Sequence, residues 1–174
     1  VLRQRTKKRI IGTFHVAVAQ LVRLLHNRAH RIAQRRHMNY RTDARNHHLA
    51  RGYEGSYNVI SRTLPYHGTT LGALSVTGIP HCRGPYLPIL WDGTRHGPNT
   101  RQCTSPVGTP VAELSCVQAI EDMILAEGPE TVSMIIAEPI QNGGGALVPP
   151  IGYWQELRRI CDRHGVLLVA CEVI

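Results

Sequence analysis

The chain has 174 residues, of which 43% are hydrophobic and 18% are charged. This length fits one domain, or one domain with an arm, and the composition excludes a chain that is disordered throughout. No run approaches the roughly 20 apolar residues of a membrane-spanning helix, so we expect no membrane association. The chain begins with Val1 and has no apolar signal segment, so we expect a cut N-terminal end and not an intact secretory precursor.

The net charge of +8 is distributed unevenly along the chain. Residues 1–62 contain 14 Lys and Arg against two acids, a net charge of +12, whereas residues 63–174 contain 6 against 10, a net charge of −4. This asymmetry does not favour nucleic acid as a partner of the whole fold, because phosphate contacts would be confined to the first third.

Residues 1–41 form a basic N-terminal arm that we expect to be irregular or helical, with one apolar stretch from Phe14 to Leu25. Three interpretations remain open: a solvated or damaged segment, an organelle-targeting arm, or a nucleic-acid-binding tail. The five cysteines include no C-x-x-C pair and the ten histidines are scattered, so we expect no metal site. We interpret the cysteines as reduced thiols of a cytoplasmic protein, with a mitochondrial location as the alternative.

Alternating strands and helices are predicted from residue 57 onwards. The run Tyr57–Ser61 is typical of a strand, residues 64–70 form a turn-rich loop, and a short helix is expected over 71–76. Residues 79–110 hold more than half of the eleven prolines and show no sustained period. This pattern predicts a long irregular excursion.

Regular structure is then predicted to return. Thr109 and Pro110 indicate the start of a helix whose apolar stripe extends to Ile124 and which stops at Gly128. The nearly all-apolar run 131–137 predicts a buried strand, because it is too short for a helix. A helix over 153–164 with Gly165 as its stop, and a second buried strand from 166, complete the pattern.

A strand, a crossover helix and a second buried strand form a unit in which the strands run parallel, which predicts an α/β fold. Ligands bind such sheets beyond the carboxyl ends of the strands. Three polar groups follow predicted strand ends: Tyr66 with His67, Glu138 with Gln141, and Cys171 with Glu172. Each has an ordinary explanation by itself, as a loop or strand-terminating residue, but together we expect them to converge on one crevice.

Several short motifs occur in order along the chain: Y-E-G at 53–55, V-I-S at 59–61, Y-H-G-T-T-L-G-A-L-S-V-T-G at 66–78, E-G-P-E-T-V at 127–132, A-E-P-I-Q-N-G-G at 137–144, P-P-I-G-Y-W at 149–154, L-R-R-I-C-D-R-H-G at 157–165 and E-V-I at 172–174. In this order they resemble the class III, pyridoxal-phosphate-dependent aminotransferases of fold type I. The resemblance implies that residues 42–174 are part of the family's large domain, which has a mainly parallel sheet.

The resemblance also implies roles in binding pyridoxal 5′-phosphate (PLP). Tyr66 would stack on one face of the pyridine ring and Val173 would pack against the other, while His67 would line the pocket. Glu138 and Gln141, which match the family's E-P-x-Q segment, would lie near the cofactor's hydroxyl group and the substrate.

Two further cofactor positions depart from the family pattern. Residues 40–44 stand where the family has its phosphate-binding segment, and Thr42 is the residue of this segment that would contact the phosphate. Cys171 stands where the family has the aspartate that pairs with the ring nitrogen, followed by Glu172 as a supporting residue. A neutral thiol is a weaker partner than a carboxylate, by about 1.5 to 3 kcal/mol for a charge-assisted hydrogen bond.

The parent reaction implied by the resemblance transfers an amino group from an amino acid or amine to a 2-oxo acid, in a homodimer. The only lysines are Lys7 and Lys8, whereas the family's Schiff-base lysine follows the D-E-V segment. We therefore assign no catalytic residue and expect the chain alone to be inactive. The alternatives are a non-catalytic binding module, whose basic arm contacts nucleic acid or an acidic partner, and a decayed gene product.

Overall fold

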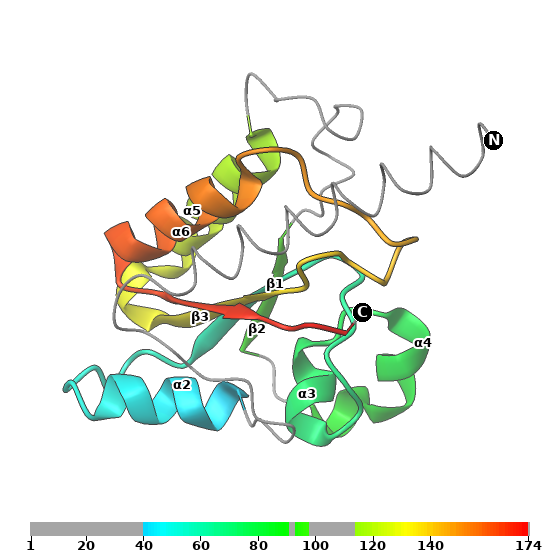
Figure 1. Cartoon of the computed structure of the whole chain (residues 1–174). Helices are drawn as coiled ribbons and strands as arrows, with labels where there is room; N and C mark the ends of the chain where they lie inside the picture. The colour runs from blue at the N-terminus through cyan, green and yellow to red at the C-terminus, as the bar shows by residue number, and fades with distance from the viewer. Residues whose placement is uncertain (1–39, 91–92, 98–113, 174) are drawn as a thin grey trace. The chain divides into compact units, whose positions relative to one another are not determined.

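The computed structural model describes residues 40–90, 93–97 and 114–173, which belong to the compact unit formed by residues 34–174 (Figure 1). Four parallel strands form its sheet in the order β2-β1-β3-β4. Their bounds are β1 Asn58–Arg62, β2 Thr94–Gly97, β3 Val132–Ala137 and β4 Leu167–Ala170. The expected α/β fold with a mainly parallel sheet is confirmed, whereas the expectations for residues 1–39 lie outside the described residues.

Helices lie on both faces of this sheet (Figure 1). The α-helices are α2 Tyr40–Leu49, α3 Leu71–Val76, α4 Pro80–Arg83, α5 Ser115–Glu127 and α6 Tyr153–His164, and two 3-10 turns are η1 Gly84–Ile89 and η3 Pro129–Thr131. In Figure 1, α5 and α6 run side by side along one face, whereas α2 and α3 lie toward the other. Both faces of the central strands are therefore covered, as all-parallel sheets require.

The hydrophobic core lies between the sheet and the α5–α6 layer. All six residues of β3 are buried, which agrees with its nearly all-apolar sequence. The helices contribute residues at helical spacing, and the core consists of Ile60, Cys116, Val117, Ile120, Ile124, Val132, Ile135, Tyr153, Leu157, Ile160, Cys161 and Val166. The apolar stripes read from the sequence therefore face the sheet.

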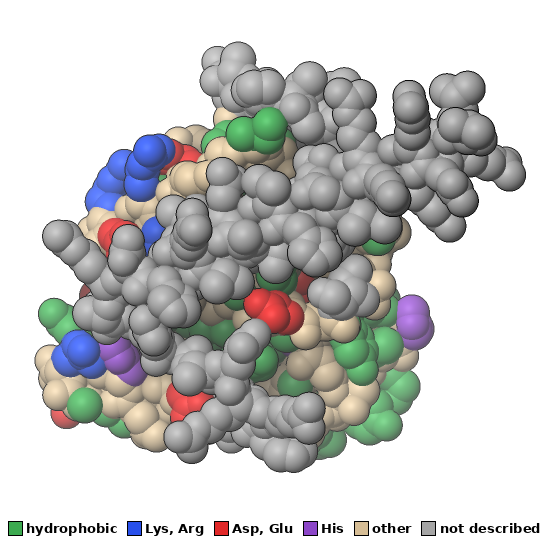
Figure 2. Space-filling view, in the orientation of Figure 1, with side chains coloured by type: hydrophobic (Ala, Val, Ile, Leu, Met, Phe, Trp, Pro, Cys, Tyr) green, Lys and Arg blue, Asp and Glu red, His purple; other side chains and the backbone are tan. Residues whose placement is uncertain are grey.

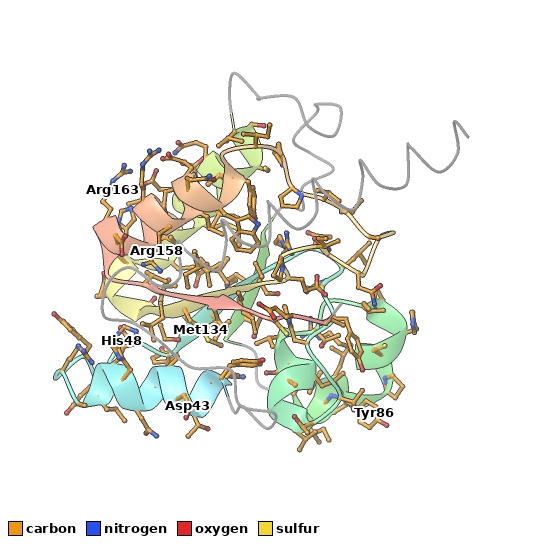
Figure 3. All side chains as sticks on the ribbon, in the orientation of Figure 1. Asp43, His48, Tyr86, Met134, Arg158 and Arg163 are labelled. Carbon is orange, nitrogen blue, oxygen red and sulfur yellow. The ribbon has the colours of Figure 1, made fainter. Side chains whose placement is uncertain are left out.

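On the opposite face, α2 is anchored to β3 by a buried histidine. The Nε2 atom of His48 lies 2.8 Å from the backbone oxygen of Ser133, and the side chain points from α2 toward β3 near Met134 (Figure 3). His48 and Ala44 are buried, one helical turn apart. This packing holds α2, which begins at Tyr40, against the sheet.

Several helix ends follow the sequence signals. The α5 helix ends at Gly128, and α6 ends at Gly165, whose left-handed backbone (φ 68°) lets its N–H bond the carbonyl of Cys161. The helix start expected at Thr109 and Pro110 lies outside the described residues. In α6, Tyr153 is fully buried, and Trp154 is half-buried and packs against the core.

The expectation of an irregular excursion over residues 79–110 is wrong for its first part. The segment contains α4, η1 and the edge strand β2, whose residues pair in parallel with β1. The Thr-Arg-His-Gly sequence of β2 shows no apolar alternation, so its strand conformation is decided by backbone pairing with β1 and not by local propensity.

The cysteines differ in oxidation state. Cys82, Cys161 and Cys171 are free thiols, but Cys116 is disulfide-bonded, so the interpretation of all five as reduced is wrong at that position. Spacing along the chain carries no information on which cysteines approach one another. None of the described helices is long and apolar enough to cross a membrane.

Candidate functional site

The loop after β1 carries Tyr66 and His67 at the carboxyl edge of the sheet. Tyr66 is half-buried, and its backbone N–H donates to Oε1 of Glu138 at 3.1 Å. His67 is buried, and its backbone N–H donates to Oγ1 of Thr77, the C-cap of α3, at 3.0 Å. The loop is thus tied to the end of β3 and to the end of α3.

Glu138 follows the last residue of β3 and is fully buried. The guanidinium of Arg62 donates to the backbone oxygen of Glu138, and its Nη2 lies 3.7 Å from the carboxylate Oε2. Burial raises the pKa of Glu138, whereas the N–H of Tyr66 and the charge of Arg62 act in the opposite direction. Within the described part of the chain, Oε2 has no hydrogen-bond partner.

Gln141 is also fully buried, three residues after Glu138. Its Nε2 donates to the backbone oxygen of Thr63 at 2.6 Å. Its own backbone pairs in both directions with Leu147, with N···O distances of 3.0 and 2.8 Å. Among the described atoms, its Oε1 has no hydrogen-bond partner. A buried amide oxygen and a buried carboxylate oxygen are therefore both left for a further polar group.

Cys171 follows β4, and its N–H donates to the oxygen of Ala137 at 2.9 Å. Its thiol is buried and forms a hydrogen bond with the phenol of Tyr40, the first residue of α2. Burial raises the pKa of Cys171 and, with the neighbouring thiol, raises that of Tyr40 to about 12. Both groups are consequently neutral near pH 7, and the end of β4 presents a thiol and a phenol instead of a carboxylate.

Three other residues expected in the site are more open. Thr42 is exposed in the first turn of α2, Glu172 is exposed and Val173 is half-buried. Next to Thr42, Arg41 donates from Nη1 to Oγ of Ser75 at 2.6 Å, and burial lowers its pKa to about 10. Arg41 therefore packs against α3 from the first turn of α2.

The structure brings part of the expected set together. Tyr66 and Glu138 are joined by a hydrogen bond, and the Glu138 carboxylate lies close enough to Cys171 to raise the pKa of that thiol. Thr42 lies at the start of α2 and Val173 lies after β4, and among the described residues no hydrogen bond or electrostatic interaction joins either residue to this group. In the described ranges, no group of three His, Cys, Asp or Glu side chains could hold a metal ion.

Two residues of this region were missed by sequence reasoning. Arg62 ends β1, is fully buried, and has its guanidinium carbon 6.0 Å from the ring centroid of Tyr153. Tyr40 contacts Cys171 from a helix that the sequence did not reveal. The only available signal for Arg62 was a basic residue that directly follows an apolar strand, and such residues are usually exposed.

The chain matches the model of the Aminotransferase class-III family over residues 28–174. The chain belongs to the class III aminotransferase family. It is 44% identical to an aminotransferase of Mycobacterium tuberculosis over 125 residues, which are 71% of this chain and 27% of that protein. It is 40% identical to an aminotransferase of Bacillus subtilis, over 75% of this chain and 28% of that protein.

Solved structures agree with this membership. An amine transaminase from an uncultivated Pseudomonas species, in its PLP-bound internal aldimine form, matches with a TM-score of 0.69 and 35% identity, over 76% of this chain and 30% of that one. An (S)-enantioselective omega-transaminase from Thermomicrobium roseum matches with a TM-score of 0.66 and 33% identity, over 73% and 29%. The chain of this class III aminotransferase family member thus spans less than a third of the relatives' length.

Proposed function

We propose that this chain forms part of the PLP site of a transaminase. The observation that carries the proposal is the convergence of Tyr66, Glu138 and Cys171 at the carboxyl ends of β1, β3 and β4. The buried atoms Glu138 Oε2 and Gln141 Oε1, which lack hydrogen-bond partners among the described residues, fit the approach of a polar ligand. Ligand sites of open parallel sheets occur at this edge.

In this proposal Tyr66 stacks on the cofactor ring, Val173 packs against its other face and His67 lines the pocket. Glu138 and Gln141 approach the hydroxyl side of the ring, and Thr42 contacts the phosphate. When bound, PLP supplies the electron sink that transamination requires. Cys171 fits this group less well than a carboxylate, because a neutral thiol does not hold a protonated ring nitrogen.

The proposed reaction of the whole protein moves an amino group from an amino acid or amine to a 2-oxo acid. Relatives support both halves of this statement. A Rhodobacter capsulatus relative is named taurine–pyruvate aminotransferase, and one from Halomonas elongata is named diaminobutyrate–2-oxoglutarate transaminase.

We propose that the 174-residue chain by itself catalyses no transamination, because its lysines are Lys7 and Lys8 in the basic arm. Incubation with PLP, reduction with borohydride and peptide mass spectrometry test this statement. We expect no stoichiometric pyridoxyl-lysine adduct, and a specific, stoichiometric adduct at one of these two lysines would contradict it.

Cofactor binding without a covalent bond is tested with pyridoxamine 5′-phosphate, which needs no lysine. We expect saturable binding, and a Tyr66→Ala variant that binds about threefold to tenfold more weakly because a stacking contact is lost. Tyr57→Ala is the matched control, since Tyr57 is 49% exposed and precedes β1, at the edge of the sheet opposite to the carboxyl ends of the strands. Equal affinities of the wild type and Tyr66→Ala, or no saturable binding, would remove the proposal.

We also propose that the whole protein is a cytoplasmic homodimer. An exposed apolar surface over α3, α4 and η1 supports an interface, with Leu71, Tyr86, Leu87 and Ile89 between 47% and 64% exposed (Figure 2). Contiguous apolar patches of this kind mark interaction sites more often than free surface.

A further inference from the structure

Two loops meet at the carboxyl edge of the sheet: residues 63–66 after β1 and residues 138–143 after β3. Two hydrogen bonds join them, from Gln141 Nε2 to the oxygen of Thr63 at 2.6 Å and from the N–H of Tyr66 to Glu138 Oε1 at 3.1 Å. These bonds flank Leu64 and Pro65 on both sides. The two loops therefore form one tied unit, although more than 70 residues separate them in the chain.

Gly143 makes the closest approach between the loops. A Cβ atom added at this position would overlap the backbone oxygen of Leu64. Because that obstacle is backbone and not the end of a flexible side chain, any larger residue at position 143 must displace the Leu64 carbonyl. The position thus accepts only glycine while Leu64 keeps its conformation.

Leu64 has a left-handed backbone, with a φ of 58°. This conformation is unfavourable for a residue with a Cβ, and a following proline further favours an extended backbone. Burial does not explain it, because the Leu64 side chain is 36% exposed. Such strain persists only where surrounding contacts over-determine it, and it concentrates at ligand sites.

We propose that Gln141 and Gly143 hold Leu64 in its left-handed conformation, and that Leu64 and Gly143 are thereby the positioning residues that aim Tyr66 at the cofactor. The chain bends at residues 63 and 64, after the end of β1, and the following residues lie beside Glu138. The N–H of Tyr66 then meets the Glu138 carboxylate. The consequence for the cofactor rests on the function proposed above, whereas the consequence for the loop does not.

A first test uses Gly143→Ala. Hydrogen exchange measured by NMR follows the Tyr66 amide, whose acceptor is Glu138, and amides of β4 serve as the internal reference. We expect about tenfold faster exchange at Tyr66 with unchanged exchange in β4, because the loop contact opens locally. The control is Gly144→Ala, which strains the next residue of the chain (φ 96°) but meets only the flexible side chain of Leu147, whose Cδ1 atom would lie 3.4 Å away. Equal exchange at Tyr66 in the wild type and Gly143→Ala would overturn the inference.

A second pair of variants addresses Leu64 itself and decides the matter if Gly143→Ala does not fold. Asparagine tolerates a left-handed backbone and β-branched valine does not. We expect Leu64→Asn to retain the hydrogen-exchange protection of the Tyr66 amide and the affinity for pyridoxamine 5′-phosphate. In Leu64→Val we expect the protection and the affinity each to fall about tenfold. If Asn and Val behave alike, the left-handed conformation has no positioning role.

The two readouts separate this inference from the proposed function. A wild type that binds no pyridoxamine 5′-phosphate, while Gly143→Ala and Leu64→Val still expose the Tyr66 amide, would refute the cofactor site and retain the loop mechanism. Normal cofactor binding with unchanged Tyr66 exchange in both variants would refute the loop mechanism and retain the site.

Discussion

Arg62 and Glu138, at the ends of two adjacent parallel strands, form an ion pair in which the side chains are 1% and 0% exposed. The guanidinium donates to the backbone oxygen of Glu138 and approaches its carboxylate to 3.7 Å. The carboxylate in turn accepts the N–H of Tyr66. The cation thus compensates the buried charge that anchors the loop after β1.

Replacement of Arg62 by methionine removes this compensating charge. We expect the free energy of unfolding to fall by about 3 to 5 kcal/mol near pH 7, because a buried carboxylate is left unpaired. Arg62 lowers the pKa of Glu138, so without it Glu138 takes up a proton at higher pH. The difference from the wild type should therefore narrow as the pH falls, which urea unfolding at pH 7 and pH 5 measures.

Arg159→Met is the control for this change. Arg159 pairs with Glu156 at 2.7 Å on the surface of α6, where its side chain is 70% exposed. Such pairs contribute about 0 to 1 kcal/mol. Comparable losses in the two variants, or a loss in Arg62→Met that does not change with pH, would contradict the role given to the buried pair.

The ionised carboxylate of Glu121 should make the stability of the fold depend on pH. It is buried on α5, and its Oε1 accepts from His164 Nε2 at 2.8 Å and from Arg163 Nη1 at 2.5 Å. Arg163 lies in the last turn of α6 (Figure 3). The hydrogen bond from His164 is the main cause of the lowered pKa of Glu121, and Arg163 adds to it. A lowered pKa stabilises the fold above the unfolded value of about 4.3, and this contribution is lost as the pH falls through the folded value.

The corresponding variant is Glu121→Gln. We expect it to be less stable by about 1 to 2 kcal/mol at pH 6, and to approach the wild type in acid. Thermal unfolding from pH 6 to pH 3 measures the difference, with Glu156→Gln as a surface control. A difference in melting temperature between the wild type and Glu121→Gln that grows as the pH falls would refute the stabilising role of the Glu121 carboxylate.

Cys171→Asp should strengthen cofactor binding. A carboxylate at this position offers a charge-assisted hydrogen bond that the thiol lacks, so we expect about tenfold tighter binding of pyridoxamine 5′-phosphate. The new charge lies near buried Glu138, so the same variant should unfold at a lower temperature. Cys171→Asn is the matched neutral control, and equal affinities of the Asp and Asn variants would argue against the position assigned to residue 171.

Tyr40→Phe should raise the pKa of the Cys171 thiol while leaving the aromatic ring of residue 40 in place. The Tyr40 phenol lowers the pKa of the Cys171 thiol through their hydrogen bond, against the effect of burial. Its loss should shift alkylation of Cys171 to higher pH, as measured by peptide mass spectrometry over a pH series. Cys161, whose pKa burial raises to about 12, is the internal reference that should not change.

The candidate site shows where sequence reasoning succeeds. Tyr66, Glu138 and Cys171 were expected at one edge because each follows a strand in a parallel sheet, and that inference needs only local patterns. Arg62 and Tyr40 were not expected, because their roles depend on contacts across the sheet. An arginine is rarely buried, so nothing in its neighbours along the chain predicts that it pairs with Glu138.

The amino-acid sequence by itself determined the parallel α/β architecture and the aminotransferase family, because apolar periodicity, breakers and ordered motifs are properties of short segments. Only the tertiary structure decided that β2 joins the sheet edge, that Tyr40 meets Cys171 and that Gly143 lies against the Leu64 carbonyl. These features arise when backbones distant in the chain approach each other. The free energies of these contacts depend on the distances between the segments, so they produce no periodic pattern in the amino-acid sequence.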